Sequence, residues 1–190
     1  MAENIENEFK KLHDIFILKE INRTGKVKNR FESSAEHSWS CMILAQYFLP
    51  KIKHRIDEKK IMRMLLYHDV IEIESGDTIV FDSDKVLGQR EKEHSSLSGM
   101  KKRMPKGLAD DFSVLWLEFE ENKTIEAKFC QAIDKLDPVI HAIFDEDDWK
   151  YNSINEEKLR KAKQQYFEPF PEMMEFFESL VSFAKKKHYF

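Results

Sequence analysis

Residues 67–78, with the sequence YHDVIEIESGDT, carry one histidine and several carboxylates close together. His68 continues an apolar stripe of helical spacing through Met64 and Leu65, so its side chain is expected to point where core side chains point. The adjacent Asp69 adds a negative charge at the same place. Burying such charge is costly unless something compensates for it, and a bound cation is one such compensation. The segment therefore suggests a metal site.

Glu72 extends this cluster along the same predicted helix. It lies four residues after His68 and three after Asp69, so it projects over the same helix face. Neutral imidazole and carboxylate groups are standard ligands of Zn, Mn, Fe and Co ions. Because two ligands on one helix do not close a metal site, the others must come from different segments.

Two other segments offer such ligands, each on a separate predicted helix. The stretch AEHSW places His37 one turn into a helix whose start, SSAE (Ser33–Glu36), has the form of a capping box. The stretch AIDKLDP places Asp134 in the middle of another helix. Asp137 lies one turn further on, and periodicity does not choose between the two aspartates. Each residue alone is more often a packed or surface residue, so the joint spacing carries the prediction.

The elements that must position these residues are predicted to be helices. Five glycines and five prolines punctuate the 190 residues, helical periodicity dominates, and we find no convincing strand alternation. The expected helices are 5–21, 33–49, 57–71, 84–104, 108–121, one capped by Thr124 and containing Pro138, and two that begin at Asn155 and Pro171. We predict an all-α fold of seven or eight helices in a single domain, 1–190, which includes the C-terminal helices at 155–187.

Composition narrows the class of protein. Hydrophobic residues make up 42% and charged residues 35% of the chain, which is typical of a globular domain with a charged surface. The net charge of −4 gives no general attraction to nucleic acid or to an acidic membrane, and no apolar run is long enough to span a bilayer. Cys41 and Cys130 lie far apart, which favours free thiols and a cytoplasmic location.

Four segments together resemble a known family. ESSAEHSW, YHDVIEIESGDT, LWLEFEENKTIEAKF and AIDKLDP look like successive signature segments of the HD-domain metal-dependent phosphohydrolases, in the branch that contains the bacterial 5'-deoxynucleotidases. The resemblance extends from about Arg23 to Trp149. The last forty residues are not characteristic of the family.

The resemblance implies a set of metal ligands. His37, His68, Asp69 and Asp134 occupy the ligand positions, and Asp134 rather than Asp137 is at the matching position. One divalent ion per chain is implied, and Mn, Co, Mg, Zn and Fe all suit this ligand set.

The resemblance also implies residues for catalysis and substrate binding. Glu72 and Asp77 match acidic residues that serve the hydrolytic step. Arg23, in RTG, matches a region that lines the substrate phosphate and sugar. Many relatives carry a tryptophan just after this region and a longer loop, whereas this chain has Lys26 and a shorter loop before Glu32. This departure bears on nucleotide selectivity and leaves the metal ligands unaffected.

The expected activity is hydrolysis of a nucleoside 5'-monophosphate, with a preference for the deoxy form, to a nucleoside and phosphate. Because residues 23–30 include four basic side chains, another phosphorylated metabolite or a nucleoside triphosphate is the alternative substrate. A helical binding protein with a vestigial site is the non-enzymatic alternative, and it would be expected to lack a ligand. The family resemblance further suggests a homodimer.

Overall fold

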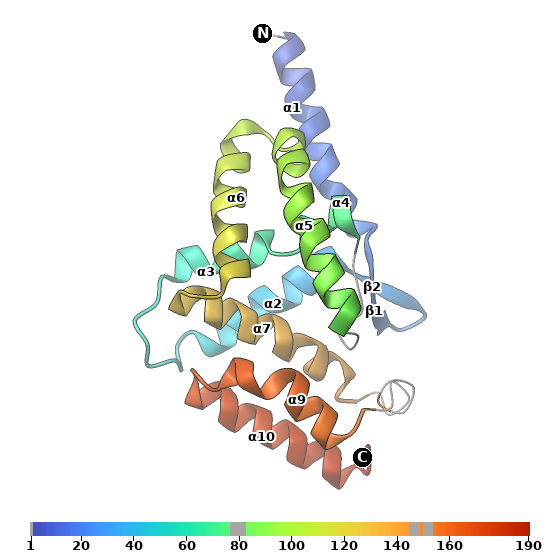
Figure 1. Ribbon diagram of the computed structural model, residues 1–190, viewed down its shortest axis with the longest axis vertical. Coiled ribbons are helices and arrows are strands. Elements are labelled where there is room, and N and C mark those ends of the chain that lie inside the picture. Colours follow the sequence, from blue (N-terminus) through green and yellow to red (C-terminus); the bar gives the residue numbers. More distant parts are fainter. Residues whose placement is uncertain (1, 77–82, 145–148, 150–153) are drawn as a thin grey trace.

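The structure is a computed structural model that describes residues 2–76, 83–144, 149 and 154–190 (Figure 1). In chain order its elements are α1 (Ala2–Ile15), the 3-10 helix η1 (Phe16–Lys19), β1 (Asn22–Val27), β2 (Arg30–Ser33), α2 (Ser34–Phe48), α3 (Glu58–Tyr67), α4 (Glu72–Ser75), α5 (Ser83–Arg103), α6 (Lys106–Glu121), α7 (Ile125–Ala142), α9 (Glu156–Phe167) and α10 (Pro171–Lys186).

Helices dominate the described residues, and the predicted all-α fold class is confirmed. Eight α-helices of ten residues or more are present in the described ranges, together with the short α4. The predicted capping box is present at the start of α2: the Ser33 side chain accepts from the backbone N–H of Glu36, and the Glu36 carboxylate accepts from that of Ser33. Thr124 caps α7 by accepting from the backbone N–H of Ala127. Local sequence signals thus locate these helix starts correctly.

The hairpin formed by β1 and β2 corrects the expectation of no strands. The two strands are antiparallel, with Lys26 opposite Phe31 and Val27 opposite Arg30. Lys28 begins the tight connection with a φ of 55°, in the left-handed region. Exposure alternates along β1, but the half-buried positions include an arginine and a glycine. The alternation is therefore not one of hydrophobicity, and a search for apolar alternation misses it.

The first helix is also shorter than predicted. Apolar residues continue at helical spacing to residue 21. The helix α1 nevertheless ends at Ile15, and η1 follows it before β1 begins. Arg23 consequently lies on β1, the first strand of the hairpin that precedes α2. This strand contacts α7, and β2 contacts α2, so the hairpin lies beside the helices that carry His37 and Asp134.

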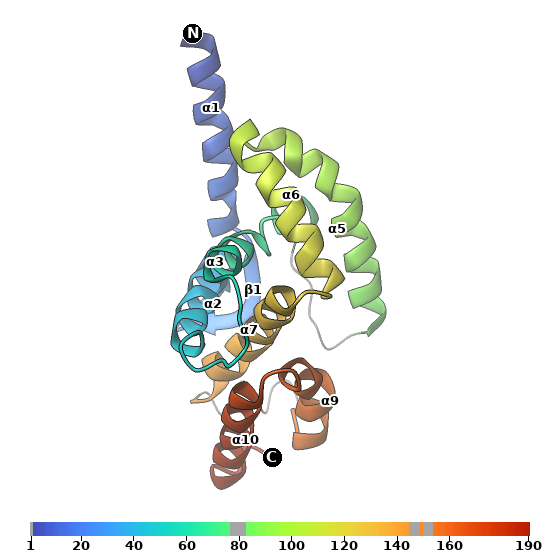
Figure 2. The same ribbon diagram turned by 90° about the vertical axis from the view of Figure 1, so that its left-hand side faces the viewer.

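The helices around α7 form the centre of the molecule. Helices α2, α3 and α6 each contact α7 from the N-terminal part of the chain, and α9 and α10 contact it from the C-terminal part. Figures 1 and 2 show α9 and α10 side by side at one end of the molecule, while α1 projects from the other end. The core side chains of α2, α3 and α7 are fully buried at Cys41, Leu65 and Ile133. Residues far apart in sequence are thereby held on a rigid frame.

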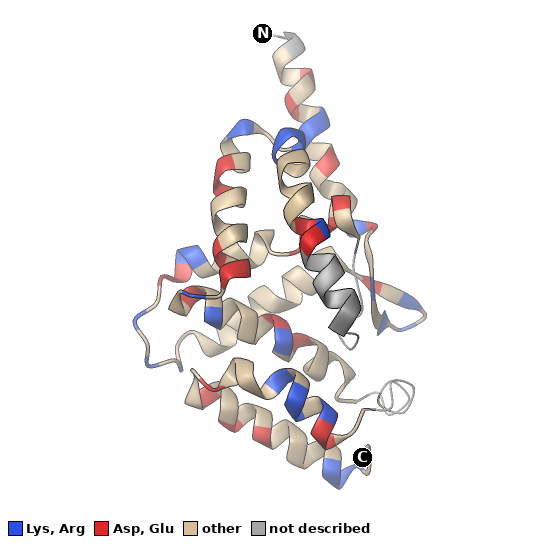
Figure 3. Cartoon of the chain, viewed as in Figure 1, with Lys and Arg blue, Asp and Glu red and all other residues tan. Residues whose placement is uncertain are grey.

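Charged residues of both signs are spread over the helices (Figure 3). The C-terminal pair is an example, since Arg160 of α9 forms a bidentate ion pair with Glu178 of α10 at 2.6 and 2.8 Å. None of the helices described here is long and apolar enough to cross a membrane.

Candidate metal centre

Five of the predicted site residues meet in one buried cluster. They come from α2, from the segment between α3 and α4, from the start of α4 and from α7. Each is 9% exposed or less: His37, His68, Asp69, Glu72 and Asp134. Buried ionisable groups at this density need partners, and the contacts below identify them.

His37 lies between two aspartates of α7. Its Nε2 is 3.0 Å from Oδ1 of Asp134, and its Nδ1 is 2.7 Å from Oδ2 of Asp137. The two aspartates that periodicity left unresolved therefore both contact the same imidazole, on opposite nitrogens. Nε2 of His37 also lies 3.8 Å from Oδ2 of Asp69, so this nitrogen faces the centre of the cluster.

His68 presents one nitrogen to the cluster without a hydrogen-bond partner. Its Nδ1 lies 2.8 Å from the carbonyl oxygen of Leu65, so Nδ1 carries the proton and donates it. Within the part of the chain that the structure describes, the buried Nε2 has no hydrogen-bond partner. It lies 3.3 Å from Oδ1 of Asp69. A buried nitrogen lone pair of this kind is a suitable metal donor.

The chain around His68 differs from the predicted helix. The helix expected at 57–71 ends at Tyr67, and His68 is its C-cap. Glu72 opens α4 after a short turn. The chain therefore changes direction between His68 and Glu72. The two residues lie close together because of this turn, and not because they share one face of a continuous helix.

Arg23 links the carboxylates of this segment. Its Nη1 donates to Oδ2 of Asp69 at 2.9 Å and lies 4.0 Å from Oε1 of Glu72. The Ser34 hydroxyl donates to the other oxygen of Glu72 from the first turn of α2. The guanidinium thus faces the centre, where an anionic substrate would be bound by it.

The structure does not bring the Lys26 side chain to this cluster. Successive residues of β1 face opposite sides, and Lys26 is exposed while Arg23 and Gly25 are partly buried. The backbone oxygen of Lys26 accepts a hydrogen bond from Nε2 of His141 at 2.7 Å. The structure thus places the Lys26 side chain at an exposed position of β1, and its role in substrate binding stays a prediction. The predicted catalytic residue Asp77 lies outside the described residues.

Glu32 adds a further carboxylate behind Arg23. Its Oε2 lies 3.9 Å from Nε of Arg23, and its Oε1 lies 3.5 Å from Nδ1 of His141. Burial, followed by the negative charge of Asp137, raises the pKa of Glu32. Glu32 is thus a carboxyl group that binds a proton more readily than usual.

The imidazole and carboxylate at the centre stabilise each other's charged forms. Burial acts to lower the pKa of His37, but the Cys41 sulfur and the hydrogen bonds to Asp134 and Asp137 outweigh it, so this pKa is raised well above its usual value. Burial acts to raise the pKa of Asp134, but Lys135 and His37 hold it well below its usual value. In the metal-free chain, a proton bound to His37 thus offsets part of the negative charge that a metal ion would offset.

Two lysines add positive charge close to the cluster, and the sequence alone did not indicate either of them. Nζ of Lys135 donates to Oδ2 of Asp134 at 2.6 Å. Lys163 of α9 is 4% exposed, and burial together with the charge of Lys135 lowers its pKa to about 7. It also interacts electrostatically with Asp134 and Asp137. No motif marks this part of the chain, so only the packing of α9 on α7 identifies Lys163.

When His37 is neutral, as a metal-bound imidazole must be, the carboxylates outnumber the cations in the described part of the cluster. The carboxylates are Glu32, Asp69, Glu72, Asp134 and Asp137, and the cations are Arg23, Lys135 and Lys163. A divalent cation would offset the excess negative charge, and the unpartnered His68 nitrogen would be a donor to it. The residues therefore fit a metal ion. Two groups of three residues each have donor atoms that lie within 4.8 Å of one another: His37, Cys41 and His68, and Glu32, His37 and Asp137.

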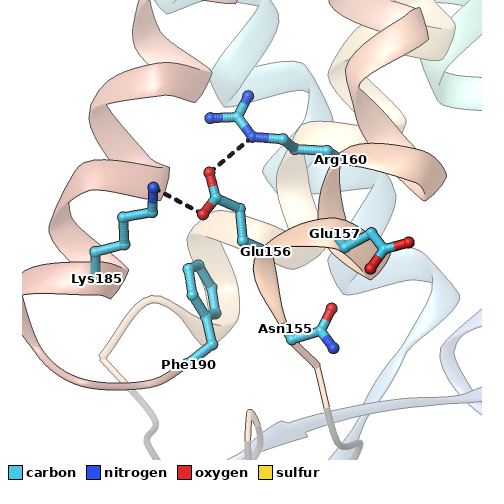
Figure 4. A pocket seen from close by; sticks show the side chains of 6 residues that line it. All are labelled: Asn155, Glu156, Glu157, Arg160, Lys185 and Phe190. Atoms are coloured by element: carbon cyan, nitrogen blue, oxygen red, sulfur yellow. Dashed lines mark hydrogen bonds and ion pairs between the residues drawn. The ribbon is translucent and has the colours of Figure 1, made fainter.

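A surface hollow of about 580 Å³ lies away from this cluster, between α9, α10 and the C-terminal residue Phe190 (Figure 4). Glu156 is its central acid and binds Nε of Arg160 at 2.9 Å and Nζ of Lys185 at 2.7 Å. These charges neutralise each other, so the hollow is a weaker candidate for a ligand-binding site than the buried cluster.

The chain matches the model of a known family over most of its length. Residues 16–174 match the family described as "HD domain", and the chain belongs to that family. The predicted membership of the HD-domain family is thereby confirmed. The match extends beyond Trp149 into α9 and α10.

Curated relatives include proteins named 5'-deoxynucleotidase HDDC2. The human protein is 26% identical over 128 residues, which cover 66% of this chain and 61% of that protein. The Xenopus laevis protein is 25% identical over 129 residues, which cover 66% of this chain and 63% of that protein. The chain thus spans less than two thirds of the length of these relatives.

Solved structures with the same fold include two phosphohydrolases. A predicted metal-dependent phosphohydrolase from Magnetospirillum magnetotacticum has a TM-score of 0.85 and 27% identity, with 97% of each chain covered. An HD-domain phosphohydrolase from Listeria innocua has a TM-score of 0.63 and 21% identity, covering 94% of this chain and 85% of that one. The second likeness concerns the fold alone.

Proposed function

We propose that this chain is a metal-dependent phosphohydrolase that releases phosphate from nucleoside 5'-monophosphates, with a preference for the deoxy form. The observation that carries the proposal is the convergence of His37, His68, Asp69 and Asp134 on one buried centre. The HDDC2 relatives are named for this reaction. Membership of the HD domain family supports an enzyme of this kind.

We propose that these four residues hold one divalent ion. Two imidazoles and two carboxylates suit Mn, Co, Fe, Mg or Zn, and are a harder set than the thiolates of structural zinc sites. Asp137 would orient His37 by accepting from its Nδ1, as carboxylates commonly do behind metal-binding histidines.

The remaining residues would bind and orient the reactants. A bound ion supplies Lewis acidity and promotes ionisation of water. Arg23 faces the centre with its guanidinium and would pair with the phosphate. We propose that Glu72, which accepts a hydrogen bond from Ser34, takes a proton from the attacking water, and that Asp77 is a second acid for proton transfer. The phosphorus–oxygen ester bond breaks, and the nucleoside leaves with a proton on its 5' oxygen.

The preference for the deoxy form is the most specific part of the proposal. Discrimination against a 2'-hydroxyl needs a clash or an unpaired polar group where it would lie. The hairpin carrying Arg23 is the element expected to provide it. Lys26, exposed on the same strand, would relax this preference if its side chain formed a hydrogen bond with the 2'-hydroxyl.

The test is phosphate release from deoxy and ribo 5'-monophosphates, a sugar phosphate and a nucleoside triphosphate, each with Mg, Mn, Co and Zn. We expect turnover of the 5'-monophosphates with a higher kcat/KM for the deoxy forms. Equal values would remove the sugar preference. Turnover of only the triphosphate or the sugar phosphate would move the activity to the alternative substrates, and metal binding without any turnover would favour a vestigial site.

We further propose a single-domain, cytoplasmic homodimer. The packing of α9 on α7 supports one domain over 1–190, and the two buried free cysteines suit a reducing compartment. Exposed apolar residues along α1, which projects from the molecule in Figure 2, support association of two copies. These are Ile5, Phe9 and Leu12 of α1, and Phe16 follows them at the start of η1. Light scattering would give the mass of the particle directly.

A further inference from the structure

Cys41 places a sulfur beside both imidazoles of the proposed metal centre. It lies one turn after His37 on α2, and it is fully buried. Its Sγ lies 3.5 Å from Nε2 and 3.8 Å from Nδ1 of His37. One donor atom from each of His37, Cys41 and His68 can be chosen so that all three lie within 4.8 Å of one another.

His68 provides an independent indication of a ligand at this place. Its Nδ1 is engaged with the Leu65 carbonyl, while its buried Nε2 has no hydrogen-bond partner among the described residues. Leaving a buried polar atom without a partner costs free energy. A metal ion bound at this nitrogen would remove that cost, and Cys41 is close enough to share the ion.

The second cysteine shows what an ordinary buried thiol looks like in this fold. Cys130 is also fully buried, and its Sγ donates to the carbonyl oxygen of Ile61 at 3.7 Å. Free cysteines of this type behave as small apolar side chains. Cys41 differs because its sulfur faces imidazole nitrogens, which are donors to the same metals that thiolates prefer.

We infer that Cys41 gives this centre a soft donor, so that a thiophilic divalent ion such as Cd²⁺ or Zn²⁺ is held by His37, His68 and Cys41. On binding, the Sγ–H bond breaks, its proton is released to solvent, and a sulfur–metal bond forms. Hard ions such as Mn²⁺ use the carboxylates and leave the thiol protonated. The inference rests on the proposed function in taking His37 and His68 as metal ligands.

Cobalt substitution tests this inference without any measurement of turnover. A Co²⁺–thiolate bond gives a near-ultraviolet charge-transfer absorption that nitrogen and oxygen ligands do not give. We expect this absorption in wild-type protein and in Cys130→Ser, the matched control, and its loss in Cys41→Ser. In competition titrations, Cys41→Ser should bind Cd²⁺ at least about tenfold more weakly, while its affinity for Mn²⁺ stays within about twofold of wild type.

The outcomes separate this inference from the proposed function. Wild-type protein that binds Co²⁺ and hydrolyses a phosphomonoester without the charge-transfer absorption would overturn the role of Cys41 alone. Absence of any Co²⁺ binding would overturn both the centre and the inference. If Cys41→Ser fails to fold, the absorption of wild-type protein still decides, because it is measured on the unaltered chain.

Discussion

His37 and Asp137, 100 residues apart in the chain, are joined by a hydrogen bond of 2.7 Å between Nδ1 and Oδ2. The bond fixes the ring so that Nε2 faces Asp134 and Asp69. It therefore gives the two aspartates of α7 different proposed roles: Asp134 as a ligand, and Asp137 as the residue that orients the imidazole.

This difference predicts unequal effects of substituting the two aspartates. Asp137→Ala should weaken metal binding by about 10–100-fold, because an outer partner of a ligating histidine is lost. Asp134→Ala should abolish stoichiometric binding. Chelator-competition titrations with Mn²⁺ measure both. Stoichiometric metal in Asp134→Ala together with loss in Asp137→Ala would reverse the two assignments.

Asp69 and Glu72 should separate metal binding from turnover. Asp69→Ala should lose metal and activity together, because Asp69 is a proposed ligand. Glu72→Ala should keep the metal and lose turnover by about 10²–10⁴-fold, the usual contribution of a positioned acid or base. Elemental analysis and phosphate release are measured on the same preparations. An empty site in Glu72→Ala would make Glu72 a ligand.

The sequence predicts the separate pieces of this cluster better than their arrangement. The capping box of α2 and the placement of Asp134 in mid-helix are both encoded by local patterns, and both are confirmed. The end of α3 at Tyr67 was not predicted, because the apolar spacing continues through His68 while the chain turns. Local periodicity does not register such a turn when tertiary contacts dictate it.

The contributions of the hairpin and of α9 depend on long-range packing. The side chain of Lys26 is carried away from the cluster by strand pairing that hydrophobic alternation does not reveal. Lys163 is buried within electrostatic range of Asp134 and Asp137 because α9 packs against α7. Neither relationship has a signature in the residues nearest to it in the chain.

Arg23 should act on substrate affinity, in contrast to a second arginine of the same hairpin. Arg23→Met should lower kcat/KM by about a hundredfold, because a cation facing the phosphate is lost. Arg30 pairs instead with Glu36 at the surface. Arg30→Met is therefore the control, and we expect a change within about twofold. A similar loss in both variants would assign the effect to the hairpin's stability and not to phosphate binding.

Lys163 should reduce the stability of the metal-free protein in a pH-dependent way. Burial, with the charge of Lys135, lowers its pKa from 10.5 to about 7 in the folded chain. Between these values the unfolded state binds more protons than the folded state, so the stability contributed by this group rises with pH. Lys163→Met removes the penalty, which is roughly 3–5 kcal/mol at neutral pH or below, at about 1.4 kcal/mol per pKa unit.

Urea unfolding of chelator-treated protein at pH 6, 8 and 10 measures this effect. The gain in unfolding free energy of Lys163→Met over wild type should be largest at pH 6 and should shrink towards pH 10, because above pH 10.5 the lysine is neutral in both states. Lys161→Met, at an exposed position of the same helix, is the control and should differ little from wild type at any pH. A gain for Lys163→Met that does not change with pH would mean that altered packing, and not a buried charge, is responsible.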